Sequence, residues 1–248
     1  MEGDEGRKFL QAGDWLGWKG LDTAQRLGQP EPPWYNVVQD EAQMIQLPEP
    51  SAELGTVSVR DVLQQRRSRR RFSDQPLALE ELAFLLWSVQ GISGGDHRKR
   101  TAPSAGARHP LETYVACSGV NSLPPGIYRY QVERHALAAL PAAAEASSLK
   151  DQLTSGCLGQ AFVGAAPVCF LWTVRPERSQ WRYGPLASKL IVLDTGHAAQ
   201  NLYLAAESIG AGTCTIGLYD QDALDGLLGV DGIHELVVYA APVGFPID

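Results

Sequence analysis

The sequence has little that would tie the protein to a disulfide scaffold, a zinc site or a membrane. Its 248 residues include only four cysteines, Cys117, Cys157, Cys169 and Cys214, which are widely spaced and form no Cys-x-x-Cys pair. Three of them lie in runs of apolar or small residues, a setting typical of buried thiols. No stretch approaches the length of a membrane span, and the acidic N-terminal residues do not resemble a signal peptide. We therefore expect a cytoplasmic protein without disulfides.

Positive charge is also scarce. The chain has 21 Lys and Arg against 28 Asp and Glu, which gives a net charge of -7 and a pI near 5.3. This is the wrong sign for a protein that binds nucleic acids through their phosphates. Hydrophobic residues make up 44% of the sequence, enough for the core of one domain. We expect a globular protein with no nucleic-acid partner.

Motifs for nucleophilic or metal catalysis are missing as well. No serine lies in a Gly-x-Ser-x-Gly elbow, and no cysteine has a setting that would clearly lower its pKa. Asp194, His197 and Asn201 share one face of a predicted helix, but two plausible ligands and an amide are too few for a closed metal site. A polar stripe at a subunit interface is the preferred interpretation, and no metal is predicted.

The chain does have one concentration of positive charge, Arg-Arg-Ser-Arg-Arg-Arg-Phe at residues 66–72. Residues 58–65 before it start with a good helix N-cap, Ser58, and continue with apolar residues at helical spacing, which places the first arginines in the last helical turn. Guanidinium groups and a serine hydroxyl can together hold a phosphate dianion. A solvated basic face is the alternative for such a run in isolation. In an acidic protein, the run indicates a small anionic ligand.

The hydrophobic pattern predicts an α+β protein. Residues 1–56 are expected to be irregular, because Trp15, Trp18 and Trp34 stand among glycines and prolines, and to lie as a strap on a surface. The longest predicted helix, at residues 186–210, is apolar over much of its circumference, which favours a central or interface position. Helices are predicted at residues 58–65, 76–91, 186–210 and around 222–228, and strands at 112–118, 126–132, 135–140, 166–174, 212–217 and 236–243.

Two further segments have functional character. Residues 102–110, Ala-Pro-Ser-Ala-Gly-Ala-Arg-His-Pro, offer small side chains and free backbone amides that suit the close approach of a flat, polar ring system. A plain connector is the alternative. Residues 210–217, Gly-Ala-Gly-Thr-Cys-Thr-Ile-Gly, follow a helix and lead into a strand, which is the reverse of a Rossmann fingerprint.

Together these three elements resemble the FMN-dependent nitroreductase superfamily, and within it the branch of SagB-type dehydrogenases. The resemblance covers about residues 56–244 and rests on RRSRRRF, PSAGARHPLETYV and GHAAQNLYLAAESIGAGTCTIG, which occur in the family's order. It implies a nitroreductase-like fold at residues 57–248, with a central mixed or antiparallel sheet flanked by helices. It also implies an entwined homodimer with two FMN sites between the subunits. Residues 1–56 would be an extension that wraps the core or the partner.

The resemblance also assigns residues to the cofactor. It implies that the FMN phosphate and ribityl chain are bound by Arg66, Arg67, Ser68 and Arg70. The loop that lies along the isoalloxazine, often from the partner subunit, is implied to contain Pro103, Ser104, Ala105 and Gly106. A backbone amide near flavin N5 is implied at Gly217, with Leu218 beside it.

The sequence departs from the family at two places. Many nitroreductases have a basic residue beyond the last strand for the phosphate, and this chain ends without one. Azoline-oxidising SagB-type members typically have a lysine-tyrosine pair where this chain has Arg182 and Tyr183. A guanidinium stays protonated, so Arg182 is a poor general base although it can orient an anion. Both residues are candidate catalytic residues, and Tyr183 could equally be an aromatic packed at a helix start.

The resemblance implies an FMN-dependent oxidoreductase that passes hydride or electrons through flavin N5, between NADH or NADPH and an organic acceptor. One alternative is a SagB-type dehydrogenase that oxidises an azoline or another heterocycle in a peptide or small molecule. The alternative from another class is a flavin-binding protein without turnover.

Overall fold

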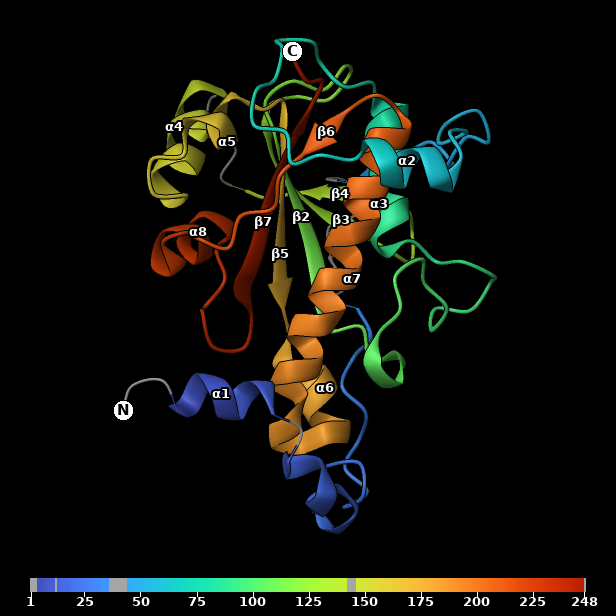
Figure 1. Cartoon of the computed structure of the whole chain (residues 1–248), viewed down its shortest axis with the longest axis vertical. Helices are drawn as coiled ribbons and strands as arrows, with labels where there is room; N and C mark the ends of the chain where they lie inside the picture. Colours follow the sequence, from blue (N-terminus) through green and yellow to red (C-terminus); the bar gives the residue numbers. More distant parts are fainter. Residues whose placement is uncertain (1–3, 12, 36–43, 142–145, 248) are drawn as a thin grey trace.

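A seven-stranded sheet lies at the centre of the computed structural model, which describes residues 4–11, 13–35, 44–141 and 146–247 (Figure 1). All neighbouring strands pair antiparallel, which agrees with the expected α+β class. In spatial order the strands are β1 (Met44–Gln46), β4 (Ala136–Ala139), β3 (Gly126–Gln131), β2 (Leu111–Cys117), β5 (Val168–Val174), β7 (Leu236–Gly244) and β6 (Gly212–Thr213).

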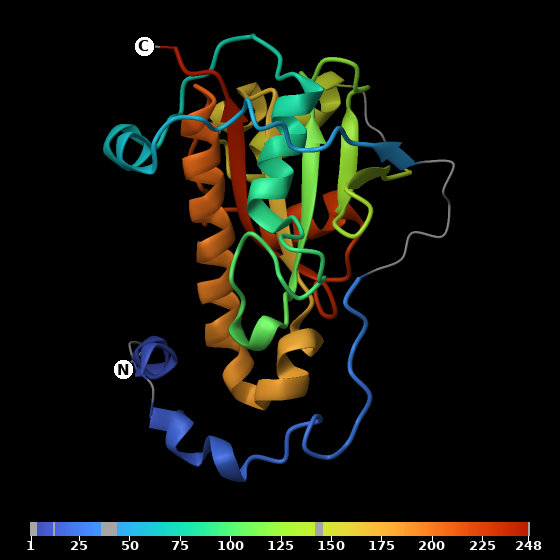
Figure 2. The ribbon, with the colours of Figure 1, turned by 90° about the vertical axis from the view of Figure 1, so that its right-hand side faces the viewer.

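Helices cover both faces of the sheet (Figures 1 and 2). This explains why β2 and β5 are buried along their whole length; β5 reads as a nearly continuous apolar run, and β2 also buries Glu112 and Thr113. Along β2, Val115 faces one core cluster and Tyr114 and Ala116 face the other, as strand alternation requires. One face carries α3 (Leu79–Gln90) and α7 (Ala187–Ser208), and the other carries α4 (Ala146–Gly156), α5 (Ala161–Ala165) and α8 (Gln221–Leu228).

The helix before the arginine run, α2 (Val59–Gln65), begins as predicted. The Ser58 side chain caps it by accepting a hydrogen bond from the Asp61 amide at 3.2 Å. The prediction that the first arginines lie in the last helical turn was wrong, because the helix ends at Gln65. The chain then runs extended beside β6, where the Arg69 amide donates to the Thr213 carbonyl at 2.9 Å.

The long helix was predicted almost to its ends, but the strand after it is shorter than expected. Gly210, with φ +76°, provides the left-handed turn after α7. The strand predicted at residues 212–217 is reduced to the two residues of β6. Beyond them the amide of Thr215 donates to the hydroxyl of Tyr203, at 3.0 Å, instead of pairing with a strand.

A helix that the sequence pattern did not predict, α6 (Pro176–Tyr183), joins β5 to α7 through a short 3-10 turn, η4 (Gly184–Leu186). Tyr183 therefore ends a helix, and its expected place at a helix start was wrong. The helix escaped detection because its buried positions are polar, Arg178 and Ser179, so it has no apolar periodicity.

The N-terminal segment, expected to be irregular, contains α1 (Asp4–Leu10), the 3-10 helix η1 (Gly13–Gly20) and β1. β1 adds to the open edge of the sheet by pairing with β4. Lower in the molecule the segment passes α6 (Figure 2), where the Gln25 amide donates to the Trp181 carbonyl at 2.8 Å. The Trp181 indole in turn donates to the Gln29 carbonyl at 2.9 Å. Among the described helices, none combines the length and apolar character needed to cross a bilayer.

Candidate functional site

A cluster of hydroxyl groups joins the arginine run to the glycine-rich segment after α7. The Ser68 and Tyr203 hydroxyls are 3.1 Å apart, and the Tyr239 hydroxyl donates to Thr215 Oγ1 at 2.8 Å. The Thr215 amide completes the link to Tyr203. Sequence reasoning missed Tyr203 and Tyr239, although Tyr203 stands inside the third motif and its aromatic hydroxyl was a usable signal. The first and third motifs thus meet in the folded chain.

The arginines of the run add positive charge next to this cluster in the chain, and Arg66 lies directly beside it. The Arg66 guanidinium lies 5.2 Å from the Tyr203 ring centre, and that of Arg70 lies 6.0 Å from the Phe162 ring centre. Arg67 Nη1 donates to the carbonyls of Gln64 and Arg66, at 3.0 and 2.8 Å. Within the described part of the chain, none of the three pairs with a carboxylate. Their charge is therefore available to an anion.

A glycine allows the run to approach β6 so closely. A Cβ atom at Gly212 would lie 2.8 Å from Cβ of Arg69, which is closer than side chains tolerate. The absence of a side chain therefore lets Ser68 reach the hydroxyl cluster.

The predicted N5 neighbours, Gly217 and Leu218, follow the cluster along the chain. Both are exposed, Leu218 by 66%, and the Leu218 carbonyl accepts a hydrogen bond from Gln160 Nε2 at 2.9 Å. A Cβ atom at Gly217 would lie 3.8 Å from the ring of Tyr239. The two residues thus border the same cluster on an open surface.

The loop with Pro103 to Gly106 is held by a buried carboxylate on α7. Asp194 accepts hydrogen bonds from the Ser104 hydroxyl at 2.6 Å and from the Ala105 amide at 3.0 Å. The loop forms a short 3-10 turn, η3 (Ala105–Ala107), in which Ala107 has φ +52°. A left-handed non-glycine residue costs about 1–2 kcal/mol. The bonds to Asp194 offset this strain and fix the loop.

Burial changes the ionisation of two groups at this loop. Burial raises the pKa of Asp194, although the hydrogen bonds from Ser104 and Ala105 act in the opposite direction. Burial, helped by the nearby Arg100, lowers the pKa of His109 to about 4. The His109 imidazole is therefore neutral at pH 7 and is not a proton donor for a reaction at that pH.

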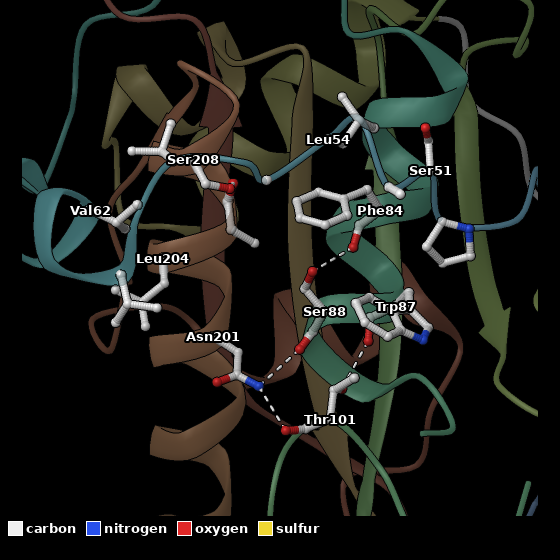
Figure 3. A pocket seen from close by; sticks show the side chains of 16 residues that line it. Ser51, Leu54, Val62, Phe84, Trp87, Ser88, Thr101, Asn201, Leu204 and Ser208 are labelled. Atoms are coloured by element: carbon white, nitrogen blue, oxygen red, sulfur yellow. Dashed lines mark hydrogen bonds between the residues drawn. The ribbon is translucent and has the colours of Figure 1, made fainter. Parts of the chain in front are cut away.

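The polar stripe of Asp194, His197 and Asn201 was predicted to lie at a subunit interface, and that placement stays a prediction; two of the three residues have partners within their own chain. Asp194 binds its own chain's loop, and Asn201 Nδ2 donates to the carbonyls of Ser88 and Thr101, at 2.9 and 3.2 Å (Figure 3). Only His197 is exposed. Among the described residues, no three His, Cys, Asp or Glu side chains are placed to hold a metal ion.

An apolar groove of about 630 Å³ lies beside Asn201 (Figure 3). Its walls come from residues 50–57, α2, α3 and α7, with Phe84 and Trp87 on one side and Leu204 on the other. None of the predicted site residues lines it. The groove is therefore separate from all three predicted cofactor-binding segments.

Arg182 and Tyr183 lie against the same loop that Asp194 holds. Gly106 has φ +59°, and a Cβ atom there would collide with the Tyr183 hydroxyl and lie 3.0 Å from Arg182 Nε. From the other side, the rings of Trp15 and Trp18 lie 6.1 and 6.3 Å from the Tyr183 ring. The N-terminal segment thus covers Tyr183.

Within one chain, the predicted residues form two separate groups. The arginine run is linked to Tyr203 of α7 and the loop is linked to Asp194, nine residues earlier on the same helix. Nine residues correspond to about 13 Å along the axis and two and a half turns, so the two attachment points lie on opposite sides of α7. The chain alone therefore does not bring the two groups together.

Comparison with known proteins gives the family. The nitroreductase family model matches residues 63–245, which include both groups of predicted residues. The chain belongs to the nitroreductase family. This family of oxidoreductases generally binds FMN. The protein named "Putative nitroreductase MJ1384" of Methanocaldococcus jannaschii is 33% identical over 205 residues, covering 82% of this chain and 97% of that protein.

A second relative supports the SagB-type branch. The trifolitoxin-processing protein TfxB of Rhizobium leguminosarum bv. trifolii is 31% identical over 156 residues. The match covers 62% of this chain and 41% of TfxB, so the chain spans less than half of that protein.

Solved structures agree with the fold of this nitroreductase. A structure from Ralstonia eutropha JMP134, described like MJ1384 as a "putative nitroreductase", has a TM-score of 0.69 and 28% identity. The match covers 88% of this chain and 99% of the Ralstonia chain. A structure from Anabaena variabilis has a TM-score of 0.65 and 26% identity over 75% of this chain, which spans 38% of that protein. The structure of the E. coli microcin synthetase McbBCD complex with truncated pro-MccB17 contains a chain with a TM-score of 0.64 and 17% identity. The match covers 98% of this chain and 94% of that chain, and at this identity it shows a likeness in fold alone.

Proposed function

We propose that this nitroreductase-family chain is an FMN-dependent oxidoreductase, and that Arg66, Arg67, Ser68 and Arg70 bind the FMN phosphate and ribityl chain. The observation that carries the proposal is the set of three arginines without carboxylate partners beside the hydroxyls of Ser68 and Thr215. An acidic protein that leaves such a set unpaired offers charge-assisted hydrogen bonds to a dianion. No basic residue beyond the last strand is then needed.

The loop and α6 would hold the isoalloxazine end. Ser104 and Ala105 are fixed by Asp194, and Gly106 leaves room at the Tyr183 hydroxyl. FMN, when bound, supplies hydride or electron transfer. The chain's own residues orient the ring, exclude water with Trp15 and Trp18, and place the Tyr183 hydroxyl where it can hold or donate a proton.

A homodimer would unite the two groups of residues. They lie on opposite sides of α7, so a partner subunit must contribute one of them to each site. The surface of α7 is suited to this, because its Val192 and Leu193 side chains are 56% and 51% exposed. At Gly196 no atom lies within 4 Å of an added Cβ, so another helix could approach closely there.

The phosphate assignment is tested with the Arg67→Ala, Ser68→Ala double variant. Each lost contact to a charged group costs about 1.5 kcal/mol, so we expect the dissociation constant of FMN to rise about a hundredfold. Equilibrium titration followed by flavin fluorescence measures it. Arg71→Ala, which removes an exposed arginine of the same run, is the matched control and should bind FMN normally. Unchanged FMN affinity in the double variant contradicts the assignment.

A second candidate function, oxidation of an azoline in a peptide or small molecule, is favoured by the similarity to TfxB. Mixing the FMN-loaded protein anaerobically with each candidate electron donor distinguishes the two functions. We expect NADH or NADPH to bleach the flavin absorbance quickly and an azoline peptide to bleach it slowly, because Arg182 replaces the lysine of the azoline oxidisers and a guanidinium is a poor base. The reverse order would establish the dehydrogenase, and a flavin reduced by neither would indicate a binding protein without turnover.

A further inference from the structure

The N-terminal segment, α6 and the Gly106 loop border a small, partly open cavity of about 200 Å³. Its lining includes Glu31, Trp34, Arg98, Arg108, Trp181 and Arg182, with Gly106 at one side. Three arginines against one glutamate make its lining positive in a protein whose net charge is -7. Most ligand pockets occupy about 300–1,000 Å³, so this one suits a small molecule or one end of a larger one.

One of the three arginines has a structural role. Arg108, whose side chain is 4% exposed, forms an ion pair with Glu31 and donates from Nε to the Arg178 carbonyl at 2.8 Å. Its guanidinium lies between two indoles, 4.6 Å from the Trp34 ring centre and 4.7 Å from that of Trp181. Its charge is therefore neutralised and its position fixed, and it acts as a wall of the cavity.

The other two arginines have charge to offer. Among the described residues, the side chains of Arg98 and Arg182 form no hydrogen bond and no ion pair. Arg182 Nε is buried without a partner, and a buried unpaired donor is costly. Arg98 lies over the Trp34 ring, 5.4 Å from its centre. Two guanidinium groups without a carboxylate partner in the described ranges of the chain, one of them with a buried nitrogen, thus border one cavity and can bind an anion there.

We propose that this cavity binds the carboxylate of a small, planar carboxylic acid, and that Arg182, assisted by Arg98, selects this substrate. The guanidinium fork matches a carboxylate with two parallel hydrogen bonds. The inference rests on the proposed function, in which Gly106 lies along the flavin, so that a ring attached to the carboxylate stacks on the isoalloxazine. Arg182 then binds substrate and transfers no proton, and the N-terminal segment contributes to specificity through Glu31 and Trp34.

The experiment compares benzoate with its neutral analogue benzamide, by calorimetry and by quenching of tryptophan fluorescence. We expect benzoate to bind at least about tenfold more tightly than benzamide, and Arg182→Gln to abolish this preference by weakening benzoate alone. Arg98→Gln should reduce the preference less, because Arg98 is exposed. Arg60→Gln, an exposed arginine of α2, is the matched control and should retain it.

Three outcomes would overturn the proposal. These are equal binding of benzoate and benzamide by the unaltered protein, equal weakening of both by Arg182→Gln, and loss of FMN from that variant, which would make Arg182 a flavin ligand. A thermal melt shows that the variant is folded. Tryptophan quenching does not need the flavin, so a protein that fails to take up FMN contradicts the proposed function while the carboxylate preference can still be measured.

Discussion

Replacing Arg178 with methionine lowers the free energy of unfolding by about 3–5 kcal/mol at pH 7. The Arg178 side chain is 2% exposed, and its Nη2 donates to Glu112 at 2.5 Å. The other nitrogens donate to the carbonyls of Pro33 and His109, at 3.0 and 3.3 Å. The substitution leaves the Glu112 carboxylate buried with only part of its compensating charge, and removes one of the links between the N-terminal segment and the loop. Equilibrium unfolding in urea measures the free energy of unfolding of the variant and of the unaltered protein.

The pH dependence identifies the cause of this loss. Burial pushes the pKa of Glu112 upward, but the charges of Arg178 and Arg129 outweigh it and the pKa is lowered. A lowered pKa means that the stabilisation is complete above the unfolded value, near 4.5, and is lost as the pH falls through the folded value. The deficit of the Arg178→Met variant should therefore shrink below pH 4.5. A deficit that is constant with pH would indicate lost packing instead.

Two controls accompany this variant. Adding Glu112→Gln to Arg178→Met should recover part of the loss, because the second change removes the uncompensated charge. Arg60→Met, on the exposed surface of α2, should change the free energy of unfolding by less than about 0.5 kcal/mol.

Introducing aspartate at both Val192 and Leu193 should give a folded monomer that no longer binds FMN. Both side chains are more than half exposed on α7, so the isolated fold tolerates the change. In the proposed dimer they lie on the surface of α7 that faces the partner subunit, where two buried, unpaired charges on each subunit would prevent association. Because each site needs residues from both subunits, we expect the affinity for FMN to fall by more than about a thousandfold, the loss of several charge-assisted contacts together.

Light scattering measures the mass, and flavin fluorescence measures binding. The matched control is Ile233→Asp, which charges an apolar residue that is 74% exposed in the segment between α8 and β7. It should remain a dimer with bound FMN. A monomeric double variant that keeps its affinity for FMN would show that one chain holds the cofactor.

The elements that the sequence predicted well are those whose burial follows a simple period. α3 and α7 have apolar residues at helical spacing, and β5 is a nearly continuous apolar run because helices cover both faces of the sheet. The elements that it missed lack such a period. α6 buries Arg178 and Ser179, and β1 is a three-residue edge strand stabilised by its pairing with β4.

The sequence by itself determined the family, the order of the three motifs and the presence of an arginine run, because these depend on residue types at close spacing along the chain. Only the tertiary structure decided which motifs meet. Tyr203 joins the arginine run to the glycine-rich segment, and Asp194 holds the loop on the opposite side of the same helix. It also decided which arginines are paired with carboxylates and which are not. Such contacts join residues far apart in sequence, and local spacing carries no information about them.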